Sequence, residues 1–227
     1  MLEKEGLRIA AVSYDPEETL RSFAEKYQIR FPLLSDRDSA VIRSFGIFNT
    51  NIAPGLRAHG VPHPVEYLVA PDGVVIRKYF VPNYQHRVTA SAVVLREFGV
   101  ADDATRITLQ SGAVTVEIGL SSAKAFAGQE LSFFAKFTIE QGWHVYADTL
   151  VTFDDSKIIR QSFEFGEALQ GLGTLLLKFP LEAGTTTLSG QVRFQQCSET
   201  VCEPPETIPF ELPLTLEPFM AVTAGVP

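Results

Sequence analysis

The stretch Thr187-Leu-Ser-Gly-Gln-Val-Arg-Phe-Gln-Gln196, followed by Cys197-Ser-Glu-Thr-Val-Cys202-Glu-Pro-Pro-Glu-Thr207, decides how the second half of the chain folds. Strand-forming residues flank the two cysteines on both sides. Five fully extended residue steps would span about 17 Å, whereas a disulfide needs its Cα atoms within about 4.4 to 6.8 Å of each other. A disulfide here therefore requires the chain to turn back, with Ser-Glu-Thr-Val as the loop of a hairpin.

The same strand pattern extends outward from this hairpin. Short strand-like segments follow one another from Thr105 to Leu216, and they are separated by turn signals such as Ser111-Gly112 and Gln141-Gly142. Many short strands with regular turns are typical of a β-sandwich. We therefore predict an all-β domain over residues 103–218 and a loose tail over residues 219–227.

The first half of the chain has a different pattern, in which strand and helix signals alternate. Leu7–Tyr14 is apolar almost throughout, as in a buried strand, and a helix is expected after Asp15-Pro16-Glu17-Glu18. Pro71-Asp72-Gly73 is a strong turn signal between two further strands. Thr89–Phe98 has the pattern of a final amphipathic helix. Residues 1–102 are therefore predicted to form an α/β domain, with Asp102-Asp103 as the linker.

Composition and charge argue against a nucleic-acid-binding protein and against a membrane-spanning protein. The chain has 227 residues, 45% of them hydrophobic, and a net charge of −8. Residues 104–227 contain 7 Lys and Arg against 14 Asp and Glu, a balance of −7. Nucleic-acid binding needs clustered cations, so no nucleic-acid partner is expected. No apolar run is long enough to span a membrane, and the first residues do not resemble a signal peptide.

Several segments of the first half carry a resemblance to a known family. Ala11-Val-Ser-Tyr-Asp15, Phe31-Pro-Leu-Leu-Ser-Asp36, Gly60-Val-Pro-His-Pro64 and Val69-Ala-Pro-Asp-Gly-Val74 resemble, in order and spacing, the C-terminal part of a peroxiredoxin-like (AhpC/TSA) thioredoxin fold, over about residues 6–98. In that family the reactive cysteine lies upstream of the segment matched by Leu7–Tyr14.

The resemblance therefore implies an incomplete thioredoxin-like domain without its peroxidatic cysteine. Both cysteines of the chain lie in the second half, so peroxidase activity is not expected from this chain. A fragment of a longer gene product and a degenerate scaffold are both possible explanations, and we favour the fragment.

The two cysteines allow three interpretations. A permanent disulfide closing so short a loop would contribute only about 2 kcal/mol, which favours a reversible redox pair over a structural one. A metal site would need further ligands, and His59 and His63 have no third ligand nearby in the sequence, so neither a metal nor a cofactor is expected. Glu199, Glu203 and Glu206 surround the pair, and Arg193 is the nearest cation.

These carboxylates disfavour the thiolate form of the cysteines. The pair is therefore better suited to a relay, in which a partner's activated thiol attacks the disulfide, or the reduced pair reduces a partner's disulfide.

A second resemblance concerns the cysteine region itself. Gly142-Trp-His-Val-Tyr146, the strand Thr187–Phe194 and Cys197-x4-Cys202-x-Pro-Pro-Glu-Thr207 resemble the N-terminal periplasmic domain of the thiol:disulfide interchange protein DsbD, over about residues 105–217. The resemblance implies an immunoglobulin-like β-sandwich, a periplasmic or other extracytoplasmic location, and thioredoxin-like redox proteins as partners.

It also implies roles for the two cysteines: Cys202 forms the mixed disulfide and Cys197 resolves it. Residues 148–167 do not match the loop that caps the cysteines in this family, so no capping residue is assigned. Trp143 is expected in the core, and His144 is expected to be a hydrogen-bonded structural residue.

Three functions remain open on the sequence. The first is thiol-disulfide exchange through Cys197 and Cys202, attached to a peroxiredoxin-like module. The second is a non-catalytic binding module in which the disulfide is a permanent staple. The third is a cytosolic remnant without activity.

Overall fold

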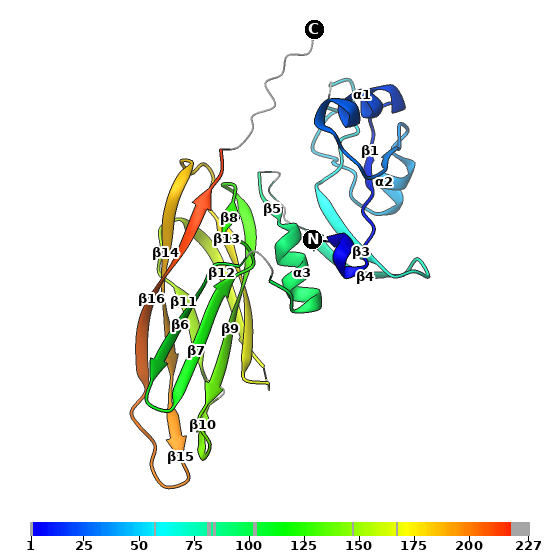
Figure 1. The fold of residues 1–227 in the computed structure, drawn as a ribbon. Coiled ribbons are helices and arrows are strands. Elements are labelled where there is room, and N and C mark those ends of the chain that lie inside the picture. The colour runs from blue at the N-terminus through cyan, green and yellow to red at the C-terminus, as the bar shows by residue number, and fades with distance from the viewer. Residues whose placement is uncertain are drawn as a thin grey trace. The chain divides into compact units, whose positions relative to one another are not determined.

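The structure is a computed structural model that describes residues 2–56, 58–80, 83, 85–101, 104–146, 148–166 and 168–218. The chain divides into two compact units, residues 1–84 and residues 85–227, which are described separately (Figure 1). The predicted linker Asp102-Asp103 and the predicted loose tail 219–227 lie outside the described residues. Among the helices that are described, none is long and apolar enough to cross a membrane.

The first unit is mixed α/β, as its sequence pattern predicts. Its elements are the 3-10 turn η1 (Leu2–Glu5), β1 (Ala11–Ser13), α1 (Glu17–Tyr27), β2 (Leu33–Ser35), α2 (Ala40–Ser44), β3 (Val65–Val69) and β4 (Val75–Phe80). β1 and β2 pair in parallel, and β3 and β4 form an antiparallel hairpin around the predicted Pro71-Asp72-Gly73 turn. The two pairs are separate two-stranded sheets.

The first unit buries few apolar side chains. Among its described residues, those that are buried are Leu20, Ile42 and Tyr79. The predicted buried strand over Leu7–Tyr14 is wrong in this respect, because β1 spans three residues and Val12 is 44% exposed. Among the residues that the structure describes, β1 pairs with β2 alone, so β1 is an edge strand of a two-stranded sheet and not the interior strand of a larger one.

The second unit is largely all-β, as predicted. Its elements are β5 (Arg87–Val88), α3 (Ala90–Phe98), β6 (Arg106–Ser111), β7 (Val114–Leu120), β8 (Lys124–Ala125), β9 (Gln129–Ile139), β10 (Trp143–Val145), β11 (Leu150–Phe153), β12 (Ile158–Phe165), β13 (Gln170–Leu177), β14 (Gly184–Phe194), β15 (Gln196–Ser198) and β16 (Glu206–Leu216). One sheet has the order β12-β13-β9-β7-β6, with β5 also on β9, and the other has the order β11-β14-β16-β8. β10 and β15 form a separate pair.

Both sheets of the second unit contribute to one apolar core. Phe133 of β9 packs edge-on against Phe153 of β11, with ring centroids 5.0 Å apart, and Phe137 of β9 meets Phe194 of β14. Gly173 of β13 makes room for the Phe133 ring, because a Cβ atom there would lie 2.2 Å from it. The shared core fixes β14 and β16, the two strands that lead to the cysteines.

α3 belongs to this second unit. Thr89 caps its first turn by accepting a hydrogen bond from the Ala92 backbone N–H, and Ser132 of β9 donates to the Ala92 carbonyl. The carboxylate of Glu130, on β9, pairs with Arg96 of α3 at 3.2 Å and with Arg160 of β12 at 2.9 Å. The compact units accordingly divide between residues 84 and 85, whereas the sequence pattern placed the boundary at 102/103.

Asp155 ties the turn between β11 and β12 to β14. Its carboxylate accepts hydrogen bonds from the Lys157 backbone N–H at 2.9 Å and from the Ser189 backbone N–H at 3.2 Å, and Lys157 Nζ lies 2.9 Å away. Burial by itself would raise the pKa of Asp155, but the hydrogen bonds from Lys157 and Ser189 and the Lys157 charge together lower it. The folded state therefore favours the ionised carboxylate.

We predict that Asp155→Asn lowers the free energy of unfolding by about 1.5 to 3 kcal/mol at neutral pH, because charge-assisted hydrogen bonds are lost. Because the folded pKa is depressed, the difference from wild type is fully present above the unfolded pKa of about 3.9 and is lost as the pH falls through the folded value. Urea denaturation of the whole chain, followed by the fluorescence of its single tryptophan, Trp143, measures this difference.

Asp154→Asn is the matched control, since the neighbouring Asp154 is exposed and the same charge is removed. Equal destabilisation by the two variants, or a difference for Asp155→Asn that does not diminish as the pH is lowered, would contradict this account of Asp155.

Candidate functional site

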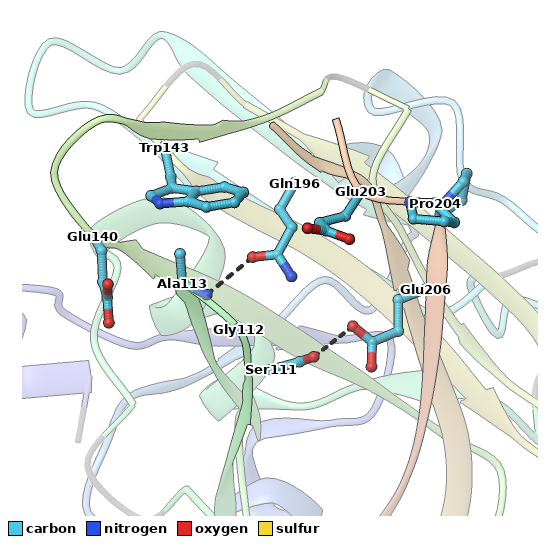
Figure 2. Close-up of a pocket in the computed structure, with 10 residues that line it drawn as sticks. Ser111, Gly112, Ala113, Glu140, Trp143, Gln196, Glu203, Pro204 and Glu206 are labelled. Carbon is cyan, nitrogen blue, oxygen red and sulfur yellow. Dashed lines mark hydrogen bonds between the residues drawn. The ribbon is translucent and has the colours of Figure 1, made fainter. Parts of the chain in front are cut away.

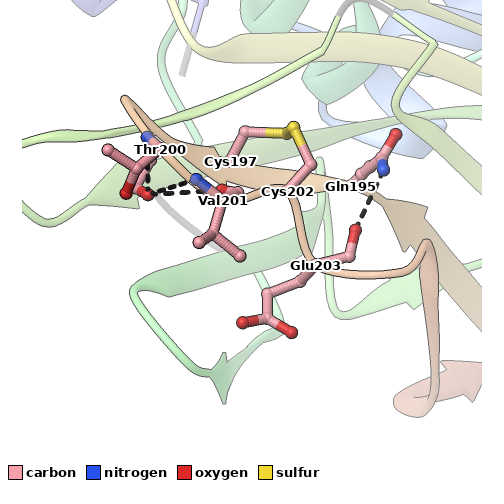
Figure 3. The surroundings of a disulfide bond; sticks show 7 residues. Gln195, Cys197, Thr200, Val201, Cys202 and Glu203 are labelled. Carbon is pink, nitrogen blue, oxygen red and sulfur yellow. Dashed lines mark hydrogen bonds between the residues drawn. A yellow bond between two sulfur atoms is a disulfide. The ribbon is translucent and has the colours of Figure 1, made fainter.

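The two cysteines are joined across a tight hairpin, as the sequence predicts. Cys197 and Cys202 are disulfide-bonded, with S–S 2.05 Å and Cα atoms 4.0 Å apart, and they form an antiparallel bridge. The Ser198 backbone N–H donates to the Val201 carbonyl at 2.7 Å, and the Ser198 hydroxyl accepts from the Val201 N–H at 3.1 Å (Figure 3). The loop is thus held by its own backbone and by one serine.

Further hydrogen bonds continue the hairpin between the disulfide and β16. The Glu203 N–H donates to the Gln196 carbonyl at 3.0 Å. The Gln195 side chain donates to the Glu203 carbonyl at 2.9 Å, as Figure 3 shows. The disulfide is therefore placed by the β14 and β16 strands and not by the loop alone.

The two cysteines differ in their exposure. Cys197 is fully buried, whereas Cys202 and its neighbour Val201 are exposed. β10 lies next to Cys197 in the sheet, because it pairs with β15 so that His144 lies opposite Cys197 and Trp143 opposite Ser198. A molecule in solution thus meets the disulfide from the Cys202 side.

The structure corrects both expectations for β10. Trp143 is not a core residue but is half-buried. The His144 side chain is exposed and has no hydrogen bond to any residue that the structure describes; its ring contacts Tyr146, with centroids 5.5 Å apart. Ala147, next along the chain, lies outside the described residues.

An open pocket of about 740 Å³ lies beside the disulfide (Figure 2). It is lined by Ser111, Gly112, Ala113, Glu140, Trp143, Gln196, Glu203, Pro204, Pro205 and Glu206. Its lining therefore comes from β6, the β6–β7 turn, the end of β9, β10, and the segments on either side of the cysteine loop. Glu203 follows Cys202 directly, so the pocket adjoins the exposed end of the disulfide.

Carboxylates dominate the charge around the site, as the sequence indicates. Glu199 lies in the loop itself, and Glu203 lines the pocket and is exposed. Glu206 accepts a hydrogen bond from the Ser111 hydroxyl. Arg193, predicted as the nearest cation, lies on β14 opposite Thr207. In the described parts of the chain, no group of three His, Cys, Asp or Glu side chains could hold a metal ion.

Two pocket residues were missed by the sequence analysis. Gln196 is 7% exposed, and its Oε1 accepts a hydrogen bond from the Ala113 backbone N–H at 3.0 Å. Glu140 reaches the pocket from the far end of β9. The sequence held no signal that singles out Gln196, because Gln191, Arg193 and Gln195 make the same stretch polar at several positions. Nothing near the cysteines points to Glu140.

Two family models match the chain in different regions. The AhpC/TSA family matches residues 1–78, and the family described as "Thiol:disulfide interchange protein DsbD, N-terminal" matches residues 118–213. Both resemblances inferred from the sequence are thereby confirmed. The second match contains both cysteines and most of the pocket lining.

Individual relatives match the first region. Peroxiredoxin Bcp of Escherichia coli (strain K12) is 35% identical over 74 residues, which are 33% of this chain and 47% of that protein. Peroxiredoxin Bcp of Xanthomonas campestris pv. campestris is 30% identical over 77 residues, which are 34% of this chain and 48% of that protein. The chain thus spans about half the length of these relatives.

One solved structure, a DUF4426 family protein from Pseudomonas aeruginosa PAO1, aligns with 50% of this chain and 98% of its own length at 9% identity. Its TM-score of 0.28 is too low to support any conclusion about fold. The two family matches show that the chain joins a region similar to the AhpC/TSA family to a region similar to the N-terminal domain of the thiol:disulfide interchange protein DsbD.

Proposed function

We propose that the second unit is a thiol-disulfide relay, which exchanges the Cys197–Cys202 disulfide with the cysteines of thioredoxin-like redox proteins. The observation that carries this proposal is the pairing of an exposed Cys202 with a buried Cys197 in a surface hairpin. The match of residues 118–213 to the DsbD N-terminal family supports it. An immunoglobulin-like class for the sandwich and a periplasmic location are part of the same proposal.

The exchange proceeds in two balanced steps. A partner thiolate attacks Cys202 Sγ, a mixed disulfide forms, and the Cys197–Cys202 bond breaks with its electron pair leaving on Cys197 Sγ, which takes up a proton. The partner's second thiolate then attacks the sulfur of the partner's first cysteine in the mixed disulfide. The partner's own disulfide forms, and Cys202 leaves as a thiolate that takes up a proton. Two electrons and two protons pass from the partner dithiol to this pair, and the reverse sequence reduces a partner's disulfide.

The first unit has a different place in this proposal. Residues 1–84 contain no cysteine, so these residues supply no thiol for peroxide reduction. Their resemblance to peroxiredoxins supports a role as a module attached to the relay, with the relay domain as the redox-active part.

The alternative is a binding module with a permanent disulfide, and the full burial of Cys197 favours it. The two functions differ in reduction potential. A structural staple lies below about −300 mV and resists thioredoxin-type donors, whereas a relay pair equilibrates with them.

After complete reduction in the native state, we expect Cys202 to react with iodoacetamide before Cys197, because only the exposed residue meets the reagent freely. Mass spectrometry of peptides from a timed, acid-quenched reaction measures the two rates. Equal rates, or faster labelling of Cys197, would show that the difference in exposure does not direct the chemistry.

Cys197→Ser should trap a mixed disulfide through Cys202 when the variant is mixed with a thioredoxin-like protein that keeps only its attacking cysteine, activated as a disulfide with thionitrobenzoate, because neither Cys197 nor a second partner thiol is left to resolve the adduct. Cys202→Ser is the matched control, since it removes the same disulfide but leaves the buried cysteine. Non-reducing electrophoresis and peptide mapping identify the adduct. The relay is rejected if Cys197→Ser gives no adduct, or if Cys202→Ser traps as much.

A further inference from the structure

We infer that the pocket beside the disulfide receives a basic side chain, Lys or Arg, from the partner's surface next to its reactive cysteine. This inference rests on the proposed relay and adds the chemistry by which the partner is recognised. It is carried by three features of the described residues: uncompensated carboxylates, a buried amide turned into the pocket, and an aromatic wall.

Three carboxylates line the pocket, from three different segments. Glu140 follows β9, Glu203 follows Cys202, and Glu206 begins β16. Among the residues that the structure describes, none of the three forms an ion pair. A cation entering the pocket would therefore find negative charge on several sides that no protein cation already neutralises.

The Gln196 side chain is the second feature. The residue is more than nine-tenths buried. The Ala113 N–H donates to one of the two terminal amide atoms, so that atom is the oxygen Oε1 and the other is the nitrogen Nε2. Its Nε2 has no hydrogen bond to any described residue and is turned into the pocket (Figure 2). Since no buried side-chain polar atom of the described residues lacks a hydrogen-bond partner, this Nε2 is an accessible donor at the pocket surface, and a backbone carbonyl of a bound protein segment could accept its hydrogen bond beside the basic side chain.

The walls of the pocket suit a long side chain more than a small ion. The indole of Trp143 forms one side, where the aromatic face can attract a cation, and Pro204 and Pro205 form another with restricted backbone. No group of three possible ligands in the described residues is close enough to hold a metal ion. Spread-out carboxylates beside an apolar wall fit the stem and charged end of Lys or Arg.

The test compares two synthetic dithiol peptides that carry the same Cys-Ala-Ala-Cys pair, one flanked by lysines and one flanked by glutamates. The whole protein in its disulfide form is mixed with each peptide at low ionic strength, where exposed charges are least screened. Quenched samples give the rate of reduction of the Cys197–Cys202 bond. The measured quantity is the rate with the lysine peptide divided by the rate with the glutamate peptide. A substitution that changes the intrinsic reactivity of the disulfide changes both rates alike and leaves this ratio unchanged.

Wild-type protein should react faster with the lysine peptide. We expect Glu140→Gln and Glu203→Gln each to lower the ratio by about two- to fivefold. Glu199→Gln is the matched control, because it removes the same charge from the cysteine loop outside the pocket lining. A ratio near one for wild type, a preference for the glutamate peptide, or an equal fall in Glu199→Gln would overturn the inference.

The same peptides separate this inference from the relay itself. If the reduced Cys197→Ser variant attacks the oxidised, disulfide forms of both peptides, forming mixed disulfides with release of one peptide thiol, at equal initial rates, the relay stands and the basic-residue pocket is rejected. If it forms none with either peptide, the relay fails and the inference falls with it.

Discussion

The antiparallel pairing of β14 with β16 is the constraint on which the rest of the second unit depends. It runs without interruption from Gly184 opposite Leu216 to Phe194 opposite Glu206, and the shared core of the two sheets holds both strands in place. Because the register is fixed up to Phe194, the chain beyond it can only close as a hairpin. The cysteines meet for that reason, and not because the loop sequence alone would bring them together.

A second pairing, of β10 with β15, places a strand beside Cys197 but not beside Cys202. β10 pairs with the strand that carries Cys197, and the same short strand brings Trp143 to the edge of the pocket. One short strand thus neighbours the buried cysteine and also contributes to the pocket. A partner that attacks the open cysteine would contact the pocket in the same encounter.

The sequence predicted what depends on local signals. The hairpin followed from cysteine spacing between two strand-like segments, and α3 followed from the amphipathic pattern over Thr89–Phe98. Exposure of the cysteines could not be predicted, because it depends on His144 and its neighbours, about fifty residues away along the chain. The strand β11 (Leu150–Phe153) was not predicted. An alternation of apolar and polar residues over only four positions cannot be distinguished from the pattern of a loop.

The contacts of α3 decide where this protein can be cut into independent pieces. The helix lies before the apparent change in sequence pattern, yet its Arg96 shares the Glu130 carboxylate with Arg160. A fragment starting after residue 102 would lose this helix and uncover the side chains of β9 that pack beneath it, and Glu130 would keep only one of its two arginines. Separate production of the cysteine-bearing domain should therefore retain residues from about Gln85 onward.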